Sequence, residues 1–131
     1  MTQPLRTEAG SAEQFPDVVI VAGDSVKPRE AFPNLSRRVL AYNDKLMVVE
    51  HVMEQDSVFP RHSHPHEQLA YLISGRIKVQ IGDDEPFEAV AGDSFVVRGG
   101  IEHQVVAVER SVALDFFTPF REDFVQWSEL G

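Results

Sequence analysis

The sequence of 131 residues contains no cysteine. This absence excludes thiol catalysis, thiolate metal sites and disulfide bonds together, so any bound metal must use histidine, carboxylate or amide ligands. Long hydrophobic runs are also missing, because the longest aliphatic stretch, 18–22, is far shorter than the roughly 20 apolar residues that span a bilayer. The first 17 residues are polar and lack the apolar segment of a secretory signal. We therefore expect a cytoplasmic protein with no membrane anchor and no membrane partner.

Positive charge is scarce as well. The chain has 12 Lys and Arg against 21 Asp and Glu, which leaves a net charge of −9 with histidine neutral. This charge repels a phosphate backbone, and no block of Lys and Arg offsets it, so we expect no nucleic-acid partner. The length and the hydrophobic fraction of 43% are those of one ordinary globular domain. We expect residues 1–17 to form a flexible N-terminal arm and residues 18–131 to form that single domain.

Short runs of β-branched and aromatic residues, cut by turn residues, make up most of the chain from about residue 18 onward. This pattern is typical of an antiparallel sandwich or barrel. We predict strands over residues 18–22, 38–42, 46–53, 69–73, 76–81, 87–90, 94–97, 104–108 and 112–117. Near the end, Phe124 and Trp127 stand three apart after an acidic turn, which indicates one short helix. The predicted fold class is therefore all-β with a short C-terminal helix.

Three of the five histidines lie within residues 61–68. Alternate side chains of an extended segment point the same way, so His62 and His64 share a face, and neutral imidazoles placed so are suited to a divalent transition metal. Gln68 shares their parity, whereas Glu67 does not, although a turn at Pro65 would change this relation. The segment therefore predicts a metal site with an amide oxygen among its ligands.

The two other histidines differ in their surroundings. His103 follows the Gly99-Gly100 pair, whose tight turn could bring its ring beside the first cluster and complete the ligand set. His51 stands alone in a predicted strand, and we interpret it as a structural residue. Whether His66 or Glu67 joins the site is left open.

These residues fall into two spaced motifs, His62-x-His64-x3-Gln68-x6-Gly75 and Gly92-x5-Arg98-x-Gly100-x2-His103. The pair resembles the two signature motifs of the cupin superfamily, over roughly residues 35–124. The resemblance implies a double-stranded β-helix, a jelly-roll-like barrel with its ligands inside one mouth. The chain departs from the usual pattern at four positions: Gln68 for Glu, Asp56 for Gly, Arg98 for Pro and Ala107 for Asn.

The stretches 41–42, 46–47, 62–66, 91–95 and 115–124 are similar to a narrower group, the pectin-degradation cupins that act on 4,5-unsaturated uronates. That group also uses glutamine as its fourth ligand, and its chemistry converts the cyclic unsaturated monosaccharide into the linear ketonised sugar acid. The resemblance implies one divalent transition metal, Zn, Ni, Fe or Mn, held by His62, His64, Gln68 and His103. It also implies functional roles for Asp115, Phe117 and Arg121, which match an Asp-x-Phe-x3-Arg spacing.

The implied ligands are neutral, so a bound divalent ion would keep its charge of about +2 and suit a small anionic sugar acid. Arg121 is suited to binding the substrate carboxylate, and Asp115 to acid/base catalysis. Each of these residues also has a purely structural interpretation. Asp115 could be a charge paired to an arginine at the mouth, Phe117 a core residue, and Arg121 a tether paired with Glu122 or Asp123.

Other residues and functions remain open at this level. Strand positions alone suggest that Tyr71, Arg37 and Arg38 line the site. Besides a ring-opening enzyme, the motifs suit a cupin oxygenase, in which iron activates O₂, or a cupin that binds a sugar acid without catalysis. Since small cupins commonly pair through exposed sheet edges, we expect a homodimer.

Overall fold

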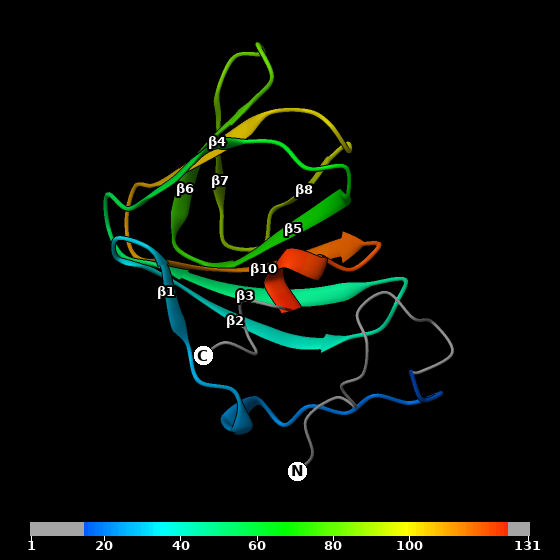
Figure 1. Cartoon of the computed structure of the whole chain (residues 1–131). Helices are drawn as coiled ribbons and strands as arrows, with labels where there is room; N and C mark the ends of the chain where they lie inside the picture. Colours follow the sequence, from blue (N-terminus) through cyan, green and yellow to red (C-terminus); the bar gives the residue numbers. More distant parts are fainter. Residues whose placement is uncertain (1–14, 126–131) are drawn as a thin grey trace.

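Two antiparallel sheets lie face to face with the core between them (Figure 1). The computed structural model describes residues 15–125. One sheet has the strand order β1-β2-β3-β10-β5-β8 and the other the order β4-β9-β6-β7. The strands are β1 Arg29–Phe32, β2 Leu35–Tyr42, β3 Met47–Met53, β4 Val58–His62, β5 Glu67–Ser74, β6 Arg76–Ile81, β7 Phe87–Val90, β8 Ser94–Val97, β9 His103–Ala107 and β10 Ser111–Thr118. This is the predicted all-β, jelly-roll-like arrangement.

Strands β3 and β10 place polar groups on the inner face of the larger sheet. Both show strict alternation of buried and partly exposed residues, as expected for strands with one face in the core. In β3 the inward series ends with His51 and Met53, and in β10 it includes Asp115 and Phe117. The same alternation that builds the core therefore aims His51 and Asp115 into the interior.

Within the described part of the chain, the core consists of two hydrophobic clusters. The first contains Leu35, Met53, Leu72, Ile77, Val79, Ala89, Ala107 and Ala113. The second contains Val39, Tyr42, Met47, Val49, Phe117, Phe120, Phe124 and Val125, so it joins β2, β3 and β10 to the segment that follows β10. Residues 122–125 of that segment are helical, as predicted, and lie beside β10 and β3 in Figure 1. Trp127, the other residue of the predicted helix, lies outside the described residues.

Most of the predicted strands are confirmed with small changes at their ends. The strands over 76–81, 87–90 and 94–97 have the predicted bounds, and those near 38–42, 46–53, 69–73, 104–108 and 112–117 shift or extend by up to three residues. The alternation of apolar and polar residues carried these predictions.

One predicted strand is wrong and two were missed. The stretch 18–22 forms no strand, and Val18 and Ile20 are 70% and 56% exposed, because β-branched residues become a strand only when a partner strand pairs with them. The partner of β2 is instead β1, which sequence reasoning left out. β4 was also missed, since Pro60 argues against a strand, but β4 is an edge strand, where proline is tolerated.

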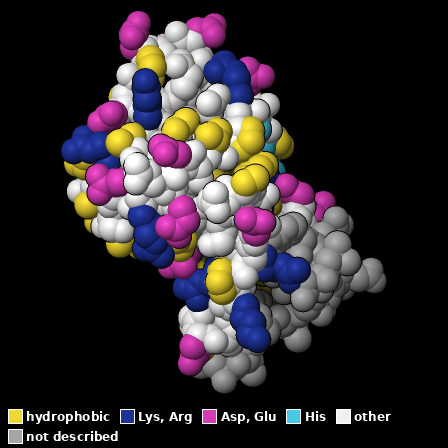
Figure 2. Space-filling model, turned by 90° about the vertical axis from the view of Figure 1, so that its left-hand side faces the viewer, with side chains coloured by type: hydrophobic (Ala, Val, Ile, Leu, Met, Phe, Trp, Pro, Cys, Tyr) yellow, Lys and Arg dark blue, Asp and Glu magenta, His cyan; other side chains and the backbone are white. Residues whose placement is uncertain are grey.

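Phe15 belongs to the predicted N-terminal arm and packs edge-on against Tyr42 and Phe120, with ring centroids 5.8 Å and 6.0 Å away. Within residues 15–125, no helix is long and apolar enough to cross a membrane. Figure 2 shows one face of the molecule, on which Lys and Arg side chains stand among Asp and Glu side chains. That face has mixed rather than basic character.

Two backbone positions fix the loops that carry the site. Gly99 lies so close to the carbonyl oxygen of Pro65 that a Cβ atom would not fit, and its N–H donates to Glu67 (2.7 Å). The next N–H, that of Gly100, donates to the carbonyl oxygen of His64 (2.8 Å). The glycine pair therefore joins the loop before β9 to the loop before β5, as the sequence led us to expect.

Candidate metal centre and pocket

Three of the predicted ligands meet at one end of the smaller sheet. His62 ends β4 and His103 begins β9, and the two are partners in the antiparallel register of these strands. His64 follows in the loop that leads to β5. One ring nitrogen of each histidine lies within 4.8 Å of the corresponding nitrogens of the other two. The structure thus brings together residues from both sequence motifs.

The orientation of each ring is set by a backbone carbonyl two residues away. The Nδ1 atoms of the three rings donate to these carbonyl oxygens: His62 to Pro60 (2.8 Å), His64 to His66 (3.1 Å) and His103 to Ile101 (3.0 Å). A neutral imidazole that donates from Nδ1 presents a lone pair at Nε2. Burial lowers the pKa of all three rings, and burial together with Arg121 lowers the pKa of His64 to about 4. At neutral pH the cluster therefore offers three lone pairs.

The donor set fits a divalent transition metal. Nε2 of His103 is buried and has no hydrogen-bond partner among residues 15–125. Nε2 of His64 lies 3.0 Å from Oε1 of Gln68, although a ring that already donates from Nδ1 carries no second proton to share when neutral. A cation bound here would accept the lone pairs of His64 Nε2 and Gln68 Oε1, which face each other without a proton between them. It would also provide a partner for Nε2 of His103. His62, His64, Gln68 and His103 are the residues that could hold it.

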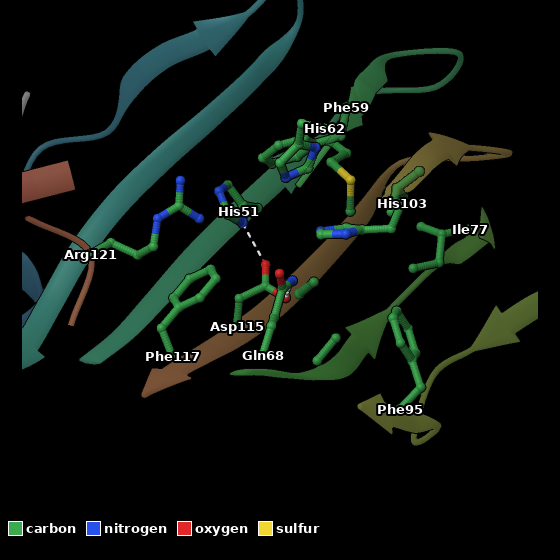
Figure 3. Close-up of a pocket in the computed structure, with 14 residues that line it drawn as sticks. His51, Phe59, His62, Gln68, Ile77, Phe95, His103, Asp115, Phe117 and Arg121 are labelled. Carbon is green, nitrogen blue, oxygen red and sulfur yellow. Dashed lines mark hydrogen bonds and ion pairs between the residues drawn. The ribbon is translucent and has the colours of Figure 1, made fainter. Parts of the chain in front are cut away.

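A pocket opens between the sheets beside this cluster (Figure 3). Its lining includes His62, Gln68 and His103 together with Asp115, Phe117 and Arg121. Asp115 is 7% exposed, and both of its oxygens accept hydrogen bonds: Oδ1 from the amide Nε2 of Gln68 (2.9 Å) and Oδ2 from Nδ1 of His51 (2.6 Å). The pocket therefore places a buried carboxylate one hydrogen bond away from a candidate ligand.

Arg121 is buried in the pocket wall and anchored by its own segment. It donates from Nε and Nη2 to the two carboxylate oxygens of Asp123 (3.1 Å and 2.9 Å), one of the pairings that the sequence left open. Its guanidinium also lies 5.1 Å from the ring centre of Phe117 and 3.9 Å from that of Phe124. Phe117 is buried in the second core cluster, and its ring also lines the pocket.

A family model described as the cupin domain matches residues 48–117, more than half of the chain. The chain belongs to the cupin family. The pectin degradation protein KdgF of Dickeya dadantii is 30% identical to this cupin over 104 residues, which are 78% of this chain and 94% of that protein.

Two solved structures are also similar to this cupin. KdgF from a Halomonas species has a TM-score of 0.75 and 28% identity, over 80% of this chain and 98% of that chain. An RmlC-like cupin from Shewanella frigidimarina has a TM-score of 0.75 and 30% identity, over 80% of this chain and 94% of that chain. The predicted resemblance to pectin-degradation cupins is therefore confirmed.

His51 is a polar residue of this pocket that sequence reasoning did not place there. It was interpreted as a lone structural histidine, yet it is 2% exposed, lines the pocket and contacts Asp115. The signal lay in its parity, because His51 falls on the inward face of β3 with Met47, Val49 and Met53. A polar residue inside an otherwise apolar inward series requires a polar partner, and this one comes from β10.

The other residues suggested from the sequence differ in where their side chains lie. His66 lies outside the three-histidine group, and Glu67 accepts from the backbone of Gly99. Tyr71 is 41% exposed, and Arg38 pairs with Glu50 on the outer side of the sheet (2.9 Å), so neither lines the pocket. Arg37 points inward and contacts His51.

Proposed function

We propose that this cupin is a metal-dependent enzyme that converts 4,5-unsaturated uronate monosaccharides into the linear ketonised sugar acid. The observation that carries the proposal is the position of Asp115, a buried carboxylate in the pocket wall that is hydrogen-bonded to a candidate metal ligand. The similarity to KdgF of Dickeya dadantii supports it, since that relative is a pectin degradation protein. The substrate class comes from the sequence resemblance.

His62, His64, Gln68 and His103 would hold the divalent metal. When bound, the metal would polarise the sugar oxygens as a Lewis acid. Each of the three histidines donates a hydrogen bond from Nδ1–H to a backbone carbonyl oxygen, which leaves the lone pair of the neutral ring at Nε2. The amide of Gln68 is kept in one orientation by Asp115.

Asp115 is the proposed proton carrier. A carboxylate has about four acceptor sites, so its bonds to His51 and Gln68 leave capacity for the substrate. In the proposed reaction Asp115 takes the proton of the C1 hydroxyl group, C1 becomes an aldehyde as its bond to the ring oxygen breaks, and the electron pair of that bond makes the ring oxygen an enolate oxygen on C5. Asp115 then returns the proton to C4, the C4=C5 double bond is lost and C5 becomes the ketone. The sum is an isomerisation in which one group both takes and returns a proton.

The charges of the pocket favour an anionic substrate. Arg37 and Arg121 are balanced by Asp115 and Asp123, and the four proposed ligands are neutral. The charge of a bound divalent ion would therefore be uncompensated until a carboxylate enters. Arg121 lies in the same wall and provides a planar guanidinium suited to that carboxylate.

We also propose that the chain forms a homodimer. Leu69, Tyr71 and Ile73 of β5 and Val96 of β8 stand 41–59% exposed on or near the outer side of the larger sheet, and β8 is one of the two edge strands of that sheet. Exposed apolar side chains beside an open sheet edge are suited to pairing with a second copy. Sedimentation of the purified protein tests this, and a monomer at all concentrations would contradict it.

The activity is tested by following the ultraviolet absorbance of the C4=C5 double bond in monosaccharides made by a digalacturonate lyase and by an alginate lyase. The metal-loaded protein should accelerate the loss of absorbance over the spontaneous rate, and equally well without oxygen. A requirement for oxygen would indicate an oxygenase instead. Saturable binding with no acceleration for either sugar would indicate a binding protein and refute the enzyme.

A further inference from the structure

A continuous series of hydrogen-bonded side chains, buried from Arg37 to Asp115 and half-buried at Gln68, connects β2 to the three-histidine cluster. Nε of Arg37 donates to Nε2 of His51 (3.0 Å), and Nδ1 of His51 bonds to Oδ2 of Asp115 (2.6 Å). Oδ1 of Asp115 accepts from the amide of Gln68 (2.9 Å), whose Oε1 faces His64 (3.0 Å). Figure 3 shows the bond between His51 and Asp115, with Gln68 beside it.

The two ends of this series of hydrogen bonds determine which atom donates and which accepts at every link. An arginine side chain has donors only, so Nε2 of His51 must be the acceptor and the ring proton must lie on Nδ1. An ionised carboxylate only accepts, so Asp115 requires the same proton position. The second oxygen of Asp115 then requires the NH₂ group of Gln68, which turns the amide oxygen toward the histidines.

We propose that His51 and Arg37 are positioning residues for Asp115 and, through it, for Gln68. Arg37 confines the proton of the His51 ring to Nδ1, and the ring then holds one oxygen of Asp115 while the other oxygen holds the amide of Gln68. The two orientations of a glutamine amide have nearly the same shape, so hydrogen bonding decides between them. This chain makes the amide present an oxygen, which binds a metal, rather than an NH₂ group, which does not.

The residues around Arg37 and His51 hold these hydrogen bonds in place. His51 is 2% exposed and Arg37 is 6% exposed, so bulk water does not compete for their hydrogen bonds. The ring of His51 meets that of Phe59 edge-on at 5.2 Å, and the guanidinium of Arg37 lies 3.8 Å from the ring centre of Phe124. Arg37 and His51 are also direct partners in the register of β2 and β3. Backbone pairing therefore sets the spacing of the first link.

Two matched pairs of variants separate hydrogen bonding from packing. In Arg37→Gln the amide nitrogen occupies the position of Nε, whereas Arg37→Met has similar length and no donor, and both variants are uncharged. In His51→Asn the side-chain nitrogen occupies the position of Nδ1, whereas His51→Leu fills the space without a donor. If the proposal holds, Arg37→Gln and His51→Asn retain more Zn²⁺ affinity and turnover than Arg37→Met and His51→Leu.

The first measurement uses ring ¹⁵N chemical shifts of the metal-free wild type, which distinguish a protonated from a bare ring nitrogen and require no variant. We expect His51 to carry its proton on Nδ1, and in Arg37→Met to accept a second proton on Nε2 at higher pH than in the wild type. Besides Arg37, the charged groups that act on this ring are Asp115 and Arg121. A wild-type ring protonated on Nε2 would overturn the proposal.

The second measurement is the affinity for Zn²⁺ alone, in competition with a chelating dye. Loss of a residue that orients a metal ligand typically costs about 10–100-fold in affinity or activity. We expect a loss of this size in His51→Leu and a smaller one in His51→Asn. Equal affinity in the wild type and His51→Leu, or equal impairment of the Asn and Leu variants, would refute a role for the hydrogen bond.

The third measurement is turnover, and this part alone rests on the proposed function. We expect His51→Leu and Arg37→Met to lower kcat by about 10–100-fold with KM changed little, because Asp115 is misplaced while Arg121 is intact. Unchanged kcat in these variants would overturn the positioning of Asp115. If the wild type has no uronate activity, the proposed function fails, and the ring shifts and Zn²⁺ affinity still decide the inference.

Discussion

Replacing Asp115 with asparagine tests the central link of the site, because the change turns one hydrogen-bond acceptor into a donor at nearly constant shape. In the native protein both oxygens accept, one from His51 and one from Gln68. Arg37 donates to Nε2 of His51, so the ring proton stays on Nδ1. The asparagine must therefore present its oxygen, not its NH₂ group, to Nδ1 of His51. The asparagine NH₂ group then meets the NH₂ group of Gln68.

The magnitude follows from what Gln68 can do next. If its amide stays in place, a buried donor is left unpaired at a cost of about 1–3 kcal/mol. If the amide rotates, its oxygen turns toward the introduced asparagine and an NH₂ group replaces the oxygen beside His64. The first response lowers the stability of the protein with or without metal, whereas the second removes a candidate ligand oxygen and should weaken Zn²⁺ binding by about 10–100-fold. Turnover should fall further, by about 10²–10⁴-fold, because the proton carrier is lost.

The assay pairs a Zn²⁺ titration against a chelating dye with the uronate absorbance assay. A second change in the same protein provides the control: Asp115→Asn combined with Gln68→Glu supplies an acceptor opposite the new NH₂ group. The double variant should recover Zn²⁺ affinity and stay inactive. Unchanged affinity in the single variant would show that Asp115 does not set the amide of Gln68, and unchanged turnover would remove Asp115 from the mechanism.

Three further predictions concern the metal, the backbone and pH. His62→Ala and His103→Ala should each lose stoichiometric metal, measured by elemental analysis, while keeping the far-ultraviolet circular dichroism of the wild type; full metal occupancy would contradict the assigned ligands. Asp56 adopts a left-handed backbone (φ 70°) where cupins usually carry glycine, so Asp56→Gly should raise the free energy of unfolding by about 1 kcal/mol in urea titrations, and a loss of stability would contradict this. Burial lowers the pKa of the three clustered histidines, so the unfolded chain takes up protons near pH 6.5 that the folded chain takes up only at lower pH, near 4 for His64. The urea midpoint of the metal-free protein should therefore be constant above about pH 7 and fall between about pH 6.5 and 4, and a midpoint that rises on acidification would contradict the sign.

Much of the fold was predictable because alternation is a local signal. Runs such as Arg76–Ile81 show one apolar and one polar face within six residues, and the strand has the predicted bounds. The failures came from signals that are not local. The stretch 18–22 has strand-like residues without a partner, and β4 contains Pro60 but lies at an edge where the sheet accepts it.

The spacing and parity of the histidine segment predicted that His62, His64, Gln68 and His103 gather, and the resemblance to the pectin-degradation cupins added Asp115, Phe117 and Arg121. The structure places these last three in a pocket that members of the histidine cluster also line. Only the tertiary structure decided how their protons are arranged. His51 meets Asp115 across 64 positions of sequence, through the pairing of β3 with β10, and meets Arg37 through the pairing of β2 with β3. Strand pairing is a long-range property, whereas hydrogen-bond direction depends on atoms that only pairing brings into contact. The sequence thus pointed to the residues of the candidate site, and the pairing of three strands decided which atoms of Arg37, His51 and Asp115 face one another.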